Sequence, residues 1–181
     1  AVGKFACASG LWSVAFGFNA CACCISSSAS GYGVKALHNK ASASGVYSCA
    51  TGASSSAFGK QSCATGANAT AIGNTAKATG DDSQAIGRVV TATGSGSTAS
   101  GAYSQALGLK STALGYYSCA TTTGTTALGW KSCATGADGT ASGAYAKATG
   151  AQSNAFGRLA LASGVESTSI GQCTCASGNY S

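Results

Sequence analysis

The sequence predicts an all-β fold, a parallel β-roll (β-solenoid) built from 14-residue coils. Three observations in the 181-residue chain predict it. Gly occupies 23 of the 26 positions spaced seven residues apart from Gly3 to Gly178. Ala stands two residues before 25 of these 26 positions. The residue directly before Gly alternates between a large apolar series and a Thr series, so the complete repeat consists of two such units.

The seven-residue unit, x-x-S/A-x-A-x-G, favours short strands over helices. A coiled coil needs bulky apolar residues at two heptad positions, whereas Gly destabilises a helix by about 1 kcal/mol per residue. In a strand, the small residues at every second position share one face. We therefore expect a roll whose interior is filled by Ala, with Gly turning the chain at the end of each strand.

Each coil contains two short strands that differ on their outer faces. Before Gly, the first strand carries a large apolar residue in nine of 13 coils, and the second most often carries Thr. About 13 coils are expected. A row of exposed apolar residues has to be covered, and a second copy of the chain is the simplest cover, so we expect a homo-oligomer. The candidate interface residues are Phe16, Phe58, Ile72, Ile86, Leu114, Leu128, Phe156 and Ile170.

The repeats predict a single solenoid domain over residues 1–181. Residues 1–45 are expected to be less regular, because Cys24 and His38 stand where the period calls for Gly. Residues 46–181 are regular and carry a longer repeat with a period of five coils. Within it, residues 48–101 and 118–171 are identical at 29 of 54 positions.

Composition excludes several classes of function. Only 8% of the residues are charged, the net charge is +6, and no dense basic patch suggests nucleic-acid binding. The chain has one His, His38, without an identified acidic partner, so we expect no enzyme, no metal site and no cofactor. No run of 18 apolar residues is present, so we expect no membrane insertion.

Seven of the ten cysteines share one position, on the outer face of the Thr strand. Three pairs are neighbours on successive coils: Cys7 with Cys21, Cys49 with Cys63, and Cys119 with Cys133. The spacing of neighbouring strands, about 4.8 Å, lies inside the Cα range of disulfides. The column therefore predicts either three disulfides between coils or a row of free thiols.

The two turns of each coil differ in chemistry. The turn after the apolar strand is aromatic and basic, and the other turn carries the four acids, Asp81, Asp82, Asp138 and Glu166. Aromatic rings with Arg and Lys suit contact with sugars and phosphate-bearing glycans, although the same residues could seal grooves between subunits. The candidate surface-binding edge consists of Tyr47, Lys60, Arg88, Tyr103, Tyr116, Tyr117, Trp130, Lys131, Tyr145 and Arg158.

Short motifs spaced by seven resemble YadA-like head repeats: TAIG at 70–73, SQAIG at 83–87, SQALG at 104–108 and STALG at 111–115. Such repeats occur in trimeric autotransporter adhesins and in phage tail fibres. The resemblance implies a left-handed β-roll that packs as a homotrimer through its apolar strands.

Three functions follow as hypotheses, and the first two place the chain outside the cell. Ten cysteines count against an autotransporter, which threads an outer membrane unfolded, so we expect a phage tail-fibre shaft that contacts a host surface glycan or receptor. The alternative is the head of a bacterial trimeric autotransporter adhesin. The row of Thr residues keeps a third hypothesis open, an ice-binding β-solenoid.

Overall fold

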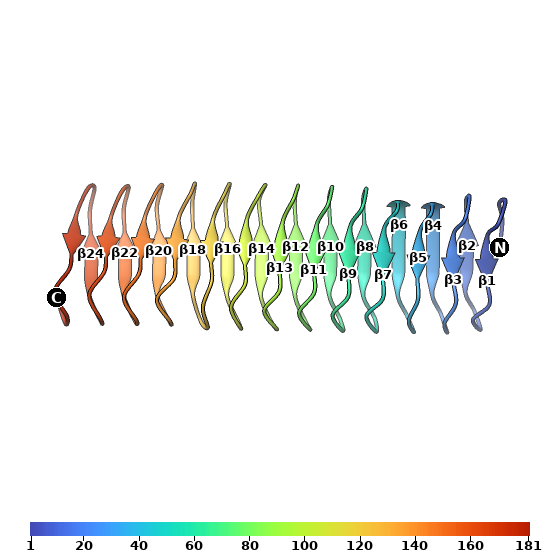
Figure 1. Ribbon diagram of the computed structural model, residues 1–181, viewed down its shortest axis with the longest axis horizontal. Helices are drawn as coiled ribbons and strands as arrows, with labels where there is room; N and C mark the ends of the chain where they lie inside the picture. The colour runs from blue at the N-terminus through green and yellow to red at the C-terminus, as the bar shows by residue number, and fades with distance from the viewer. The chain divides into compact units, whose positions relative to one another are not determined.

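The computed structural model describes all residues, 1–181, as an all-β chain of 25 short strands without helices. The chain forms two compact units, unit 1 over Ala1–Val89 and unit 2 over Val90–Ser181. Twelve even-numbered strands give about 12 turns of the expected length, close to the 13 coils predicted. The parallel β-solenoid predicted from the repeat is confirmed in each unit (Figure 1).

Unit 1 contains two parallel sheets, one of odd-numbered and one of even-numbered strands. The odd strands are β1 (Cys7–Ala8), β3 (Cys21–Ala22), β5 (Lys35–Ala36), β7 (Cys49–Ala50), β9 (Cys63–Ala64) and β11 (Lys77–Ala78). The even strands are β2 (Val14–Phe16), β4 (Ser28–Tyr32), β6 (Ser42–Val46), β8 (Ser56–Phe58), β10 (Thr70–Ile72) and β12 (Gln84–Ile86).

Unit 2 has the same organisation. Its odd strands are β13 (Thr91–Ala92), β15 (Gln105–Ala106), β17 (Cys119–Ala120), β19 (Cys133–Ala134), β21 (Lys147–Ala148), β23 (Leu161–Ala162) and β25 (Cys175–Ala176). Its even strands are β14 (Thr98–Ser100), β16 (Thr112–Leu114), β18 (Thr126–Leu128), β20 (Thr140–Ser142), β22 (Asn154–Phe156) and β24 (Thr168–Ile170).

The register within each unit follows the sequence period without a slip. Thr70, Ala71 and Ile72 of β10 pair with Gln84, Ala85 and Ile86 of β12, each partner lying one complete repeat further along the chain. Equivalent positions of successive turns therefore stack into columns, which keep one orientation because a strand alternates its two faces.

Small residues fill the interior of each turn, as the period predicts. Ala57, Ala64, Ala71 and their equivalents are completely buried, and so are the Ser residues that precede the strands. The largest fully buried side chains are Val34 and Val90, which occupy Ser positions. An interior this narrow explains why bulkier residues appear only on the outer faces.

Each turn has two corners, which we name after the strand that they follow. An even corner follows an even-numbered strand, as at residues 73–75, and an odd corner follows an odd-numbered strand, as at residues 80–82. Gly73 has φ +130°, a region that only Gly enters readily, whereas Gly66 at an odd corner has no positive φ. The even corners therefore require Gly for the backbone itself.

Candidate functional site

The outer face of the even-numbered strands carries the apolar column. Phe58, Ile72 and Ile86 follow one another on adjacent strands of unit 1, and each side chain is about 40% exposed. In unit 2 Leu114 and Leu128 are register partners, as are Phe156 and Ile170. Phe16, which Ser30 and Ser44 separate from this part of the column, is also exposed. The structure thus brings the predicted interface residues of each unit onto one face.

The even corners of unit 2 gather aromatic side chains into two clusters. The rings of Tyr103 and Tyr117 stack at a centroid distance of 4.7 Å, and Tyr116 meets Tyr117 edge-on at 4.6 Å. Trp130 and Tyr145 lie 4.9 Å apart on adjacent turns. The rings within each cluster pack against one another, and part of each ring remains exposed to solvent.

Lys131 adds a positive charge to the second cluster. Its Nζ lies 5.6 Å from the Trp130 ring centroid and 5.4 Å from that of Tyr145, within the range of cation–π contact. The side chains of Lys60, Arg88 and Arg158, which belong to other even corners, are exposed. A flat aromatic surface with a fixed cation can stack on a sugar ring and attract an anionic group.

Unit 1 has a longer aromatic ladder at its even corners. Phe18 and Tyr32 stack at 5.1 Å, Phe5 meets Phe18 edge-on at 5.7 Å, and Tyr32 meets Tyr47 edge-on at 5.3 Å. The hydrogen bond with the Tyr32 side chain raises the pKa of Tyr47. Phe5, Phe18 and Tyr32 lie at the turns expected to be aromatic, although the candidate binding edge began only at Tyr47.

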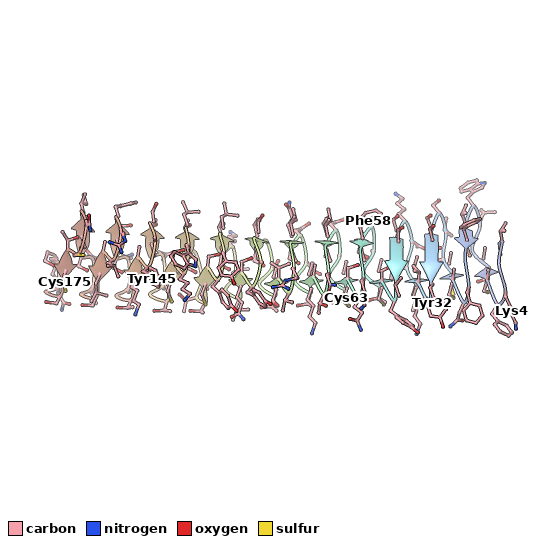
Figure 2. All side chains as sticks on the ribbon, turned by 90° about the horizontal axis from the view of Figure 1, so that it is seen from above. Lys4, Tyr32, Phe58, Cys63, Tyr145 and Cys175 are labelled. Carbon is pink, nitrogen blue, oxygen red and sulfur yellow. The ribbon has the colours of Figure 1, made fainter.

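The odd-numbered strands carry the cysteine column on their outer face. Cys49 pairs in register with Cys63, and Cys119 with Cys133. All ten cysteines are free thiols in the structure. Cys63 and the apolar Phe58 lie on opposite sides of unit 1 (Figure 2). The three predicted pairs are thus neighbours, and their oxidation to disulfides stays a prediction.

The paired thiols have different acidities. A hydrogen bond from the Cys49 side chain lowers the pKa of Cys63 to about 6, with a further contribution from the charge of Lys77, against the opposing effect of burial. The same hydrogen bond raises the pKa of Cys49. The pKa of Cys133 is likewise lowered to about 6, first by its hydrogen bond with Cys119 and then by the charge of Lys147.

A further thiol contact was missed from the sequence. The Sγ atoms of Cys21 and Cys23 lie 2.9 Å apart, because residues two apart on an extended segment project to the same side. This hydrogen bond, followed by burial, raises the pKa of Cys21 to about 11. The C-x-C spacing at 21–23 was the signal for this contact.

The polar residues of the odd corners bind backbone and one another. The Oδ1 atom of Asp81 accepts a hydrogen bond from the Ala67 N–H at 2.9 Å, and Asp82 Oδ1 accepts one from Asn68 Nδ2 at 3.0 Å. The Nδ1 atom of His38 accepts a hydrogen bond from the Asn39 N–H at 2.9 Å. These contacts stabilise corners and assemble no catalytic group.

Two further features of the whole chain concern metal binding and membranes. No three His, Cys, Asp or Glu side chains lie close enough to hold a metal ion. The structure has no helix that could cross a membrane.

Comparison with known families gives one match. The YadA head domain repeat matches residues 64–88, 92–118, 106–132 and 134–160, which together cover just over half of the chain. A comparison with curated proteins finds no match. The match lies on the regular turns, where the Ala and Gly columns run without interruption from residue 64 to Gly115. The chain belongs to the family of YadA head domain repeats.

Proposed function

We propose that this chain is an adhesin-like head or shaft segment of an extracellular fibre, assembled as a homotrimer and acting mechanically rather than as an enzyme. The exposed apolar column on the even-numbered strands carries this proposal. Membership in the YadA head repeats supports it, because such domains form trimers on surface-exposed adhesins.

The apolar column supports self-association because water is a poor solvent for it. Burying apolar surface gains about 25 cal/mol per Å², and three stacked residues such as Phe58, Ile72 and Ile86 form a continuous strip rather than scattered exposed side chains. The strip repeats along each unit at the spacing of the strands. A second and third copy would cover it with an identical strip, as cyclic symmetry requires.

The even corners would then face the surroundings. The Trp130, Tyr145 and Lys131 cluster offers two rings and a cation for a host surface glycan or receptor. The ladder of unit 1 repeats the aromatic part of this chemistry. The proposed contact surface is therefore the even corners, and the stacked backbone holds it in a fixed geometry.

The biological setting of the fibre has two candidates. The family match supports an adhesin head, whereas ten cysteines favour the phage tail-fibre shaft expected from the sequence, since such a fibre folds before it leaves the cell. Ice binding has weaker support, because Lys77 and Lys147 project beside the Thr residues.

The decisive experiment places charge in the apolar column. In the double variant Ile72→Asp and Ile86→Asp, two carboxylates on adjacent strands would have to be buried in the interface, so we expect monomers where the unchanged chain sediments as a trimer. Circular dichroism should still report the β-solenoid, because both side chains project outward.

A matched control uses the other sheet. Thr65→Asp and Thr79→Asp place the same charges directly before Gly on the odd-numbered side, where we expect trimers to persist. Intact trimers in the Ile72 and Ile86 double variant, or dissociation in the control, would overturn the assigned interface.

A further inference from the structure

The cysteine column contains a recurring triplet. On three successive odd-numbered strands of unit 1, Cys7, Cys21 and Lys35 are register partners. The next triplet is Cys49, Cys63 and Lys77, and unit 2 holds Cys119, Cys133 and Lys147. Every Lys in this column directly follows a pair of cysteines. Each dithiol therefore has a lysine on the next odd-numbered strand, and Lys35 also lies beside Cys49 on the preceding strand.

The spacing of the strands suits reversible chemistry. Adjacent parallel strands lie about 4.8 Å apart, within the Cα range of a disulfide but slightly beyond its usual Cβ separation of about 3.5–4.5 Å. Closing the bond between Cys49 and Cys63 needs a small inward movement of both strands. A disulfide formed under such strain is more easily reduced than a relaxed one.

The two thiols of a pair differ in acidity and therefore in the step of the exchange that each can perform. The hydrogen bond from Cys49, aided by Lys77, lowers the pKa of Cys63 to about 6, so Cys63 is mainly a thiolate at neutral pH. Cys49 keeps its proton, because its hydrogen bond with Cys63 and its burial raise its pKa more than the charge of Lys35 lowers it. A nucleophilic thiolate beside a protonated second thiol is what thiol–disulfide exchange requires.

We propose that the Cys49–Cys63 and Cys119–Cys133 pairs are thiol–disulfide exchange sites for low-molecular-weight disulfides, with Cys63 and Cys133 attacking and Cys49 and Cys119 resolving. The inference is independent of the proposed fibre function. The Cys7–Cys21 pair is left out, because Cys21 is engaged with Cys23 at 2.9 Å.

The exchange proceeds in two balanced steps. The Sγ atom of Cys63 attacks one sulfur of the small disulfide, whose S–S bond breaks and releases one half as a thiolate. Cys49 then gives its proton to that thiolate and attacks Cys63 Sγ, which releases the second half as a thiolate that takes a proton from solvent. The small disulfide is reduced to two thiols, and the two cysteines are oxidised to one disulfide.

The experiment uses oxidised glutathione at pH 7 with the full chain, followed by acid quenching and peptide mass spectrometry. We expect disulfides joining Cys49 to Cys63 and Cys119 to Cys133, without lasting glutathione adducts. In Cys49→Ser, the adduct should be trapped on Cys63. In Cys119→Ser the adduct should be trapped on Cys133, and in Cys133→Ser the adduct on Cys119 should form severalfold more slowly, because Lys147 lies beside Cys133 whereas the neighbour of Cys119 is Gln105.

Two controls separate the site from general thiol reactivity. Cys175 lies in the same column, but its register partner is Leu161 rather than a cysteine, and it should react no faster than Cys119 in the Cys133→Ser variant. In the Cys49→Ser background, Lys77→Gln should slow the adduct on Cys63 severalfold, whereas Lys60→Gln at an even corner should not.

Equal rates on Cys133 in Cys119→Ser and on Cys119 in Cys133→Ser would overturn the proposal. So would modification of Cys175 ahead of both pairs in the unchanged chain. Circular dichroism of each variant checks that the solenoid is intact, since the substituted side chains are on the outer face.

Discussion

The two corners of each turn begin with the same residue, Gly, for different physical reasons. At the even corner, Gly73 has φ +130°, and an added Cβ would lie 2.8 Å from the Gly87 carbonyl carbon. At the odd corner, Gly66 has an ordinary φ, and an added Cβ would lie 2.8 Å from the Asp81 nitrogen. Only the even corner combines a steric conflict with a backbone conformation closed to other residues.

The exceptions to the glycine period confirm this difference. Cys24, His38 and Thr122 all stand at odd corners, and none of them has a positive φ. The glycines of the seven-residue period on the even-numbered side, from Gly17 to Gly171, all have φ between +120° and +135°. The glycine period therefore combines two constraints. At even corners both the backbone conformation and the space require Gly, whereas at odd corners only the space favours it.

The largest expected effect comes from adding a methyl group at each corner. We expect Gly73→Ala to destabilise the protein by about 1–3 kcal/mol more than Gly66→Ala, because only the first substitution adds backbone strain to the steric conflict. Urea unfolding followed by circular dichroism measures both. Equal losses would show that the conflict with the next turn dominates and that φ contributes nothing.

The next effect concerns the buried serines that close the corners. Ser55 Oγ donates to the Gly52 carbonyl of an odd corner at 2.7 Å, whereas Ser62 Oγ donates to Gly59 of an even corner at 3.4 Å. We expect Ser55→Ala to cost about 1 kcal/mol and Ser62→Ala clearly less, because the longer bond is weaker.

Ser83 provides the control for this pair. Its buried hydroxyl has no hydrogen-bond partner in the structure, so Ser83→Ala should cause no loss of stability. A loss at Ser83 equal to that at Ser55 would mean that packing of the hydroxyl, rather than its hydrogen bond, stabilises the corner.

The smallest expected effect is a pH dependence confined to the odd-numbered sheet. The pKa of Cys63 is about 6 against an ordinary 9.0, and that of Cys49 is raised. Between pH 6 and 9 the unfolded chain binds more protons than the folded pair, so stability rises with pH. Above pH 9 the unfolded chain loses both thiol protons while the folded pair keeps one, so stability falls.

This dependence should be measured under reducing conditions by thermal unfolding across that pH range. Both thiols are partly exposed, so the amplitude will be small. Cys63→Ser should reduce the slope and leave the part contributed by Cys133, whereas Thr70→Ser, at the equivalent outer position of an even-numbered strand, should leave the curve unchanged. An identical curve for Cys63→Ser would contradict the assigned acidities.

Much of the fold could be predicted because the period acts on every turn. Small residues at alternate positions can pack only inside a narrow roll, and the same period places Ile72 above Ile86 and Cys49 beside Cys63. The candidate surfaces were predictable as columns for this reason. The C-x-C spacing is sufficient to predict the contact between Cys21 and Cys23, although this contact was not among the predictions.

Other features depend on atomic positions that no period contains. The direction of the hydrogen bond between Cys49 and Cys63, and hence which thiol is acidic, depends on how the two side chains and Lys77 are placed. The hydroxyl of Ser55 is hydrogen-bonded and that of Ser83 is not, although both residues stand at the same position of the repeat.

The sequence by itself determined the solenoid, its 14-residue register and the residues that share each column, because only small side chains can fill so narrow an interior. The tertiary structure alone decided at which corner the glycine itself has a positive φ, which serines close a corner and which thiol of a pair loses its proton. These properties depend on atomic positions within a corner and between successive turns, and the repeat pattern does not contain those positions.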